Sequence, residues 1–84
     1  MSANAAGPAR LSAIYDALRA VTVDDAEGWT TLGLMYAAVN GWLTGAGREA
    51  IPFRALEPAL KRAGYRVSDG RVTGLVLPWW KGRR

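Results

Sequence analysis

Residues 51–77 decide the fold of this 84-residue chain, and they read IPFRALEPALKRAGYRVSDGRVTGLVL. Near their end, two runs of β-favouring residues, 65–68 and 71–77, are separated by Asp69-Gly70. Asp-Gly between such runs is the strongest short signal for a hairpin, because both positions tolerate positive φ. Pro78 ends the second run, since proline cannot donate to a strand ladder. These residues therefore predict a two-stranded antiparallel hairpin.

The first half of the same stretch predicts a helix that ends at Gly64, a favourable C-terminal cap. The helix should begin near Pro52, because proline fits the first helical position, where its missing N–H costs nothing. Pro58 is expected to kink this helix or delay its start, since it removes a backbone hydrogen bond. The expected buried stripe is Phe53, Leu56 and Leu60, with Ile51 just outside as a hydrophobic staple.

Farther upstream, residues 10–21 place apolar side chains at helical spacing, which predicts a first helix of about three turns. Residues 1–9 are small and polar and include Gly7-Pro8, so a flexible lead is expected there. The apolar stripe of the first helix is Leu11, Ile14, Tyr15, Leu18 and Val21.

An acidic loop, 24–28, and a short β-favouring run, Trp29-Thr30-Thr31, separate the first helix from a second. Thr30 or Thr31 is expected to cap the second helix, with its hydroxyl accepting from an orphan backbone N–H. Asn40-Gly41 is a turn signal inside the helical pattern, but the apolar residues beyond it extend the helix. The residues at three-and-four spacing are Leu32, Met35, Tyr36, Val39, Trp42 and Leu43.

The chain contains no cysteine and no histidine, and this excludes several kinds of chemistry. The usual zinc ligands, the thiol nucleophile and the commonest general base are absent. Asp24, Asp25 and Glu27 lack the spacing of a calcium loop, so a solvated loop is expected there. We therefore expect a binding protein without a cofactor or a metal, not an enzyme. A chain without thiols also fits a reducing cytoplasm.

One stretch, 28–47, has no charged residue across 20 positions, which is long enough for a membrane span. Five of its positions are glycine and four more are threonine or asparagine, so it is less apolar than a bilayer core requires. We expect a buried helix with polar ends. The beginning of the chain lacks a basic region followed by an apolar one, so no secretory signal is expected.

The formal net charge of +4 is unevenly distributed along the chain. Residues 1–30 carry a net charge of −2, whereas residues 31–84 carry +6. Lysine and arginine concentrated in one region favour nucleic-acid binding, because they displace counterions from phosphates. The alternative is a basic protein whose surface charges are merely scattered.

The expected order of helix, short strand, helix, helix and hairpin is that of a winged helix-turn-helix, an α+β fold. In this arrangement the third helix enters the DNA major groove, and the hairpin wing touches the adjacent backbone or minor groove. We therefore expect one winged-helix domain over 10–78, preceded by the lead and followed by a basic aromatic tail at 79–84. The expected partner is double-stranded DNA.

Short motifs between residues 12 and 77 follow this order of elements. In chain order they are Ile14 to Val21, Asp24 to Glu27, Leu32 with Tyr36, Gly45 or Gly47, Ile51, Leu56 with Leu60, Gly64-Tyr65, and Gly74-Leu75-Val76-Leu77. Together they resemble the small winged-helix module at the C-terminal end of phage, plasmid and poxvirus-type primase-helicases, which also occurs free-standing in mobile elements. The resemblance implies DNA binding in replication, excision or transcriptional regulation of such an element, without catalytic residues.

The candidate contacts to DNA lie on the third helix, the hairpin and the tail. Arg54 and Lys61 are the strongest candidates, since arginine can hold guanine bidentately in the major groove. Glu57 either pairs with Lys61 at i+4 or accepts from a cytosine amino group. The full set of expected contacts is Arg54, Glu57, Lys61, Arg62, Arg66, Arg71, Lys81, Arg83 and Arg84.

Trp79 and Trp80 suggest an alternative function. Adjacent residues of a strand point to opposite faces, so one is expected to pack on the domain and the other to form an interface. The alternative is a protein-interaction module of the same fold, in which this pair binds a replication or recombination protein or a second copy. The remaining large aromatic residues expected in the core are Tyr15, Trp29, Tyr36 and Trp42.

Overall fold

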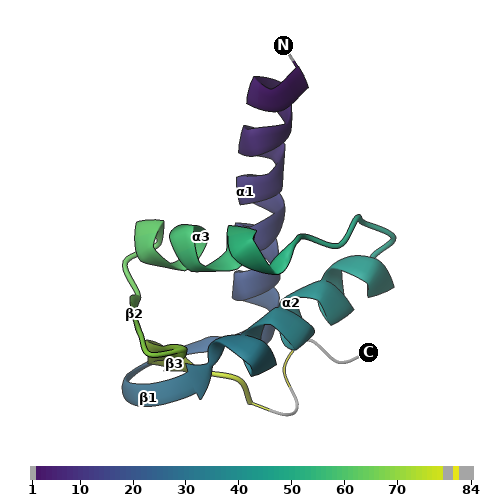
Figure 1. Cartoon of the computed structure of the whole chain (residues 1–84). Coiled ribbons are helices and arrows are strands. Elements are labelled where there is room, and N and C mark those ends of the chain that lie inside the picture. The colour runs from purple at the N-terminus through teal and green to yellow at the C-terminus, as the bar shows by residue number, and fades with distance from the viewer. Residues whose placement is uncertain (1, 79–80, 82–84) are drawn as a thin grey trace.

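The predicted α+β class is confirmed, and the strands form a three-stranded antiparallel sheet in the order β1-β3-β2. The computed structural model describes the backbone of residues 2–78 and 81, and side chains from residue 10 onward. Helix α3 lies across α1, and the sheet lies near the C-terminal end of α1 (Figure 1). The elements are α1 (Ser2–Val21), β1 (Val23–Thr31), α2 (Leu32–Gly45), the 3-10 turn η1 (Phe53–Ala55), α3 (Leu56–Arg62), β2 (Arg66–Ser68) and β3 (Arg71–Val76).

Helix α1 is longer than its apolar stripe predicted. It ends at Val21 as expected, but it begins at Ser2 rather than near Arg10. Alanine-rich sequence has high helix propensity, and adding turns to an existing helix is easier than nucleating one. The boundary predicted at Arg10 is therefore wrong, whereas the flexibility expected of residues 1–9 stays a prediction.

Strand β1 also extends beyond its predicted bounds of 29–31, into the segment predicted to be an acidic loop. Val23 pairs with Val76, and the register then shifts between Asp24 and Trp29. A shift of this kind is a bulge, in which unpaired residues let a strand bend and resume its ladder. Gly28 lies inside the bulge, where an added Cβ would collide with the Val76 side chain.

The hairpin between β2 and β3 forms as predicted. Asp69 has φ 54° and Gly70 has φ 74°. Positive φ at both central residues defines a type I′ turn, whose twist matches that of the flanking strands. The register pairs Ser68 with Arg71 and Val67 with Val72.

Helix α2 begins and continues largely as the sequence predicts. Thr31 is its N-cap, and its Oγ1 accepts from the Leu34 N–H at 3.1 Å. Asn40-Gly41 does not interrupt the helix, because the Asn40 side chain bonds outward to the backbone of Ile51. The turn signal at this dipeptide is thus explained by a tertiary contact.

Helix α3 starts at Leu56, later than the predicted start near Pro52. The 3-10 turn η1 fills the gap, with Pro52 as its N-cap. This delayed start places Pro58 in the first turn of α3, where a backbone N–H has no intrahelical acceptor. The expectation that Pro58 would delay the helix is confirmed.

The core lies between the three helices and the inner face of the sheet. Two side chains expected in it are about half exposed: Phe53 at 50% and Trp29 at 52%. Phe53 belongs to η1, so it does not continue the buried stripe of α3, Leu56 and Leu60. Trp29 points to the opposite side of β1 from its buried neighbour Thr30. Tyr15, Tyr36 and Trp42 are partly buried against the core as expected. The buried cluster is Ile14, Ala17, Leu18, Leu32, Met35, Val39, Leu43, Ile51, Leu56, Ala59, Leu60, Val72 and Leu75.

None of the helices in the described part of the chain has the length and apolar character needed to cross a membrane. The uncharged stretch 28–47 is instead divided between the end of β1, helix α2 and the connection that follows.

Candidate nucleic-acid interface

One candidate surface, the helix face, runs along η1 and α3. Its five residues line a shallow hollow of about 540 Å³: Phe53, Arg54, Glu57, Pro58 and Lys61. They recur at three-and-four spacing, so they share the side of the helix that points away from the buried residues Leu56 and Leu60. The predicted contacts Arg54, Glu57 and Lys61 are therefore brought together.

Arg54 and Lys61 differ in their electrostatic surroundings. Lys61 Nζ lies 3.0 Å from Glu57 Oε2, which is the predicted i,i+4 pair, and both side chains remain about half exposed. Within residues 10–78 and 81, Arg54 has no ion pair. Arg54 is thus the cation of the helix face whose charge is not already shared with a carboxylate.

The helix face is held in place by contacts between α2 and the segment before η1. Asn40 Oδ1 accepts from the Ile51 N–H at 2.8 Å, while Asn40 Nδ2 donates to the Ile51 carbonyl at 3.1 Å. Tyr36 Oη donates to the same carbonyl at 3.0 Å. The Tyr36 and Phe53 rings meet edge to face, with centroids 5.1 Å apart. These contacts fix how η1, and hence Arg54, leaves the body of the protein.

A second candidate surface is the outer face of the sheet, formed where β1, β3 and β2 run side by side. Directly paired residues of antiparallel strands point to the same side. Trp29 pairs with Thr73, which pairs with Arg66, and Thr31 pairs with Arg71, which pairs with Ser68. We call these six residues the sheet face.

The two predicted hairpin contacts, Arg66 and Arg71, both belong to the sheet face and are exposed. The guanidinium carbon of Arg71 lies 4.2 Å from the centroid of the Trp29 ring. Such a cation–π contact is attractive and orients both side chains. Local sequence patterns do not indicate this contact, because it depends on the pairing of two strands about 40 positions apart.

Arg62 lies apart from the helix face. It lines a separate hollow of about 680 Å³ together with Asp24, Tyr65 and Lys81, among others. Tyr65 Oη donates to Asp24 Oδ1 at 2.7 Å. Burial, together with this hydrogen bond and the nearby negative charge, raises the pKa of Tyr65 to about 12.

Lys81 points back onto the C-terminal end of α1. Its Nζ donates to the carbonyl oxygens of Arg19 at 2.9 Å and Thr22 at 2.6 Å. A cation at a helix C-terminus satisfies orphan carbonyls and complements the helix dipole. The structure shows this capping contact for Lys81, and its contact to DNA stays a prediction. The other predicted tail residues, Trp79, Trp80, Arg83 and Arg84, lie outside the described residues.

No protein-family model, curated protein or solved structure matches this chain.

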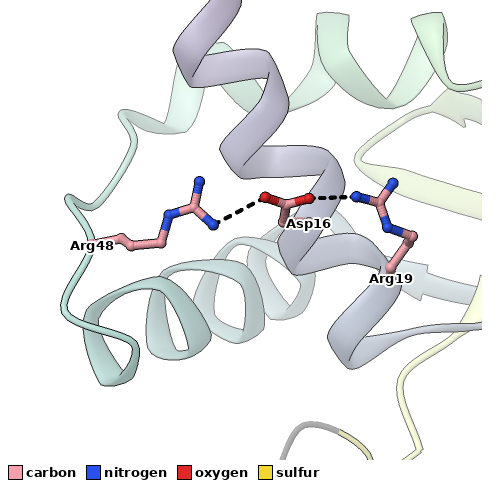
Figure 2. A network of polar contacts seen from close by, with 3 residues as sticks. All are labelled: Asp16, Arg19 and Arg48. Atoms are coloured by element: carbon pink, nitrogen blue, oxygen red, sulfur yellow. Dashed lines mark hydrogen bonds and ion pairs between the residues drawn. The ribbon is translucent and has the colours of Figure 1, made fainter.

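Arg48 shows a further use of positive charge that the sequence did not indicate. Asp16, in the C-terminal half of α1, bonds to Arg19 on the same helix and to Arg48 in the connection between α2 and η1 (Figure 2). The Arg48 contact is 3.1 Å long and spans 32 positions of sequence. Arg48 therefore ties that connection to α1.

The acidic segment of β1 does not gather into a metal site. Asp24 accepts the Tyr65 hydroxyl, and Asp25 accepts the Glu27 N–H at 3.0 Å. Among the residues that the structure describes, no three acidic side chains converge on one point.

Proposed function

We propose that this protein binds double-stranded DNA as a winged helix-turn-helix, with the helix face in the major groove and the β2–β3 hairpin on the adjacent backbone. The observation that carries the proposal is the pair of basic, solvent-exposed surfaces on consecutive elements: Arg54 on η1, and Arg66 and Arg71 on the hairpin. The order of elements and the sheet order β1-β3-β2 support the same assignment.

The helix face offers contacts of two chemical kinds. The Arg54 guanidinium can donate bidentately to O6 and N7 of guanine, or to a phosphate. Half-exposed Phe53, beside it, can pack against a thymine methyl group, which is the apolar feature of the major groove. These residues would supply preference for certain bases.

The Glu57–Lys61 ion pair must rearrange when the helix face binds DNA. Lys61 must share its charge between Glu57 and a phosphate, or Glu57 must turn to accept from a cytosine amino group. The pair is exposed and costs little to open, since exposed ion pairs contribute about 0–1 kcal/mol.

The hairpin would contribute sequence-independent affinity. Each arginine that neutralises a phosphate releases a counterion, so affinity falls as salt concentration rises. The resemblance noted above implies that such binding serves replication, excision or regulation of a mobile element, and a selection of bound sequences from a random pool would identify the target.

The test is a fluorescence anisotropy titration of a labelled random duplex pool at several salt concentrations. Arg54→Ala should weaken binding by about 1–3 kcal/mol at sequences where it contacts guanine. Arg71→Ala should weaken binding to all sequences and reduce the salt slope by about 1. Both variants should leave thermal unfolding nearly unchanged, because both side chains are exposed. Arg10→Ala is the matched control: it removes an exposed arginine from α1, away from both surfaces. Absence of salt-sensitive binding to any duplex would refute the proposal.

A further inference from the structure

The sheet face carries an unusual combination of side chains for a solvent-facing surface. Its two cross-strand rows are Trp29, Thr73 and Arg66, and Thr31, Arg71 and Ser68. It therefore holds one large aromatic ring, two guanidinium groups and three hydroxyl groups, and none of these six residues is acidic.

Trp29 is the central feature of this face. Its side chain is 52% exposed, although its neighbour Thr30 is buried beneath the sheet. The Arg71 guanidinium over the ring at 4.2 Å orients the indole on the surface. The guanidinium covers one face of the indole, so a base that stacks on that face takes the place of the guanidinium, which is then free to bind a flanking phosphate.

The positions of the cations match a nucleic-acid strand crossing the sheet. Arg66 lies two strands away from Trp29 in the same row, which corresponds to about 10 Å at ordinary strand spacing. Arg71 and Thr73 line a small hollow of about 280 Å³ with Ser68 and Asp69. Asp69 is the single carboxylate of that hollow, so positive charge exceeds negative charge across the face.

We propose that the sheet face is a binding site for single-stranded nucleic acid, in which a base stacks on Trp29 and the flanking phosphates bind Arg66 and Arg71. A duplex cannot use Trp29 in this way, because its bases are already stacked and paired within the helix. The site is distinct from the helix face and does not require the proposed duplex binding, although both use the two arginines of the hairpin.

The test is a titration of the whole protein with labelled oligothymidylate, followed by fluorescence anisotropy at low salt. Trp29→Ala should weaken binding about fivefold or more for the stacked base, and Trp29→Phe should retain most of the affinity. Leu34→Ala is the matched control, because Leu34 is a large apolar residue that is 61% exposed but lies on α2 outside the sheet face. Equal affinities of the wild type and Trp29→Ala would overturn the proposal.

Tryptophan emission provides a second readout that does not depend on the stability of the alanine variant. The chain has four tryptophans, so the difference between the wild type and Trp29→Phe isolates the emission of Trp29. Oligothymidylate should quench this difference signal, and an unchanged signal at saturating oligonucleotide would contradict stacking.

Duplex titrations of the same variants separate the two proposals. Trp29→Ala should leave duplex affinity within about twofold, whereas Arg54→Ala should weaken duplex binding and leave oligothymidylate binding intact. If the wild-type protein binds oligothymidylate with the expected dependence on Trp29 but binds no duplex, the proposed function is refuted and the sheet-face site stands. If the protein binds the duplex but its affinity for oligothymidylate is the same in the wild type and Trp29→Ala, the sheet-face site is refuted and the proposed function stands.

Discussion

Tyr65 connects α3 to the sheet through one hydrogen bond and one close packing contact. Its hydroxyl donates to Asp24, and its ring packs over Gly74, whose φ of +104° is one that side-chain-bearing residues rarely adopt. Burial is the largest cause of its raised pKa, and the hydrogen bond and charge of Asp24 add to the effect. The neutral phenol is therefore favoured in the folded protein.

This raised pKa predicts a loss of stability at high pH. The phenol ionises near pH 10 in the unfolded chain and near pH 12 in the folded protein, so between these values the unfolded chain binds fewer protons. The free energy of unfolding should receive the full Tyr65 contribution below pH 10 and lose it as pH rises to about 12. Urea unfolding across this range, compared with Tyr65→Phe, measures the effect. A wild-type profile parallel to that of the phenylalanine variant would contradict it.

Asn40 shows how one side chain joins α2 to the connection before η1. Its amide forms a reciprocal pair with the backbone N–H and C=O of Ile51, which is itself buried. Asn40→Ala leaves that N–H without its partner, which should destabilise the protein by about 1–3 kcal/mol. Chemical denaturation measures the change. Asn40→Asp retains the acceptor but loses the donor, so its effect should be smaller, and equal effects of the two substitutions would argue against the pairing.

The elements differ in how far the sequence alone could predict them. The Asp69-Gly70 hairpin and the Thr31 cap were predictable, because turn and cap chemistry are local. The outward orientation of Trp29 was not, since it follows from pairing with β3 across a bulge. The half-exposed position of Phe53 was not predictable either, because Pro58 shifts the start of α3 and leaves Phe53 in a 3-10 turn.

Charge is divided among different tasks across the whole molecule. Arg19 and Arg48 share Asp16, and Lys81 caps α1, so part of the basic excess holds the fold together. Arg54, Arg66 and Arg71 lie on the two candidate surfaces. Of the nine basic residues in 31–84, Arg48 and Lys81 are thus already engaged in contacts within the fold.

Substitutions at Asp16 test whether its ion pair with Arg48 stabilises the fold. Its carboxylate joins α1 to the connection before η1, and its side chain is only 34% exposed (Figure 2). Asp16→Asn should destabilise the protein by about 0.2–1 kcal/mol at low salt, and by less at high salt because screening weakens partly exposed pairs. A double-mutant cycle with Arg48→Gln, measured by urea unfolding, isolates the long-range contact from the one with Arg19. A coupling energy of zero at low salt would show that Arg48 does not tie the connection to α1. The positive charge of Arg48 would then be available to a nucleic acid.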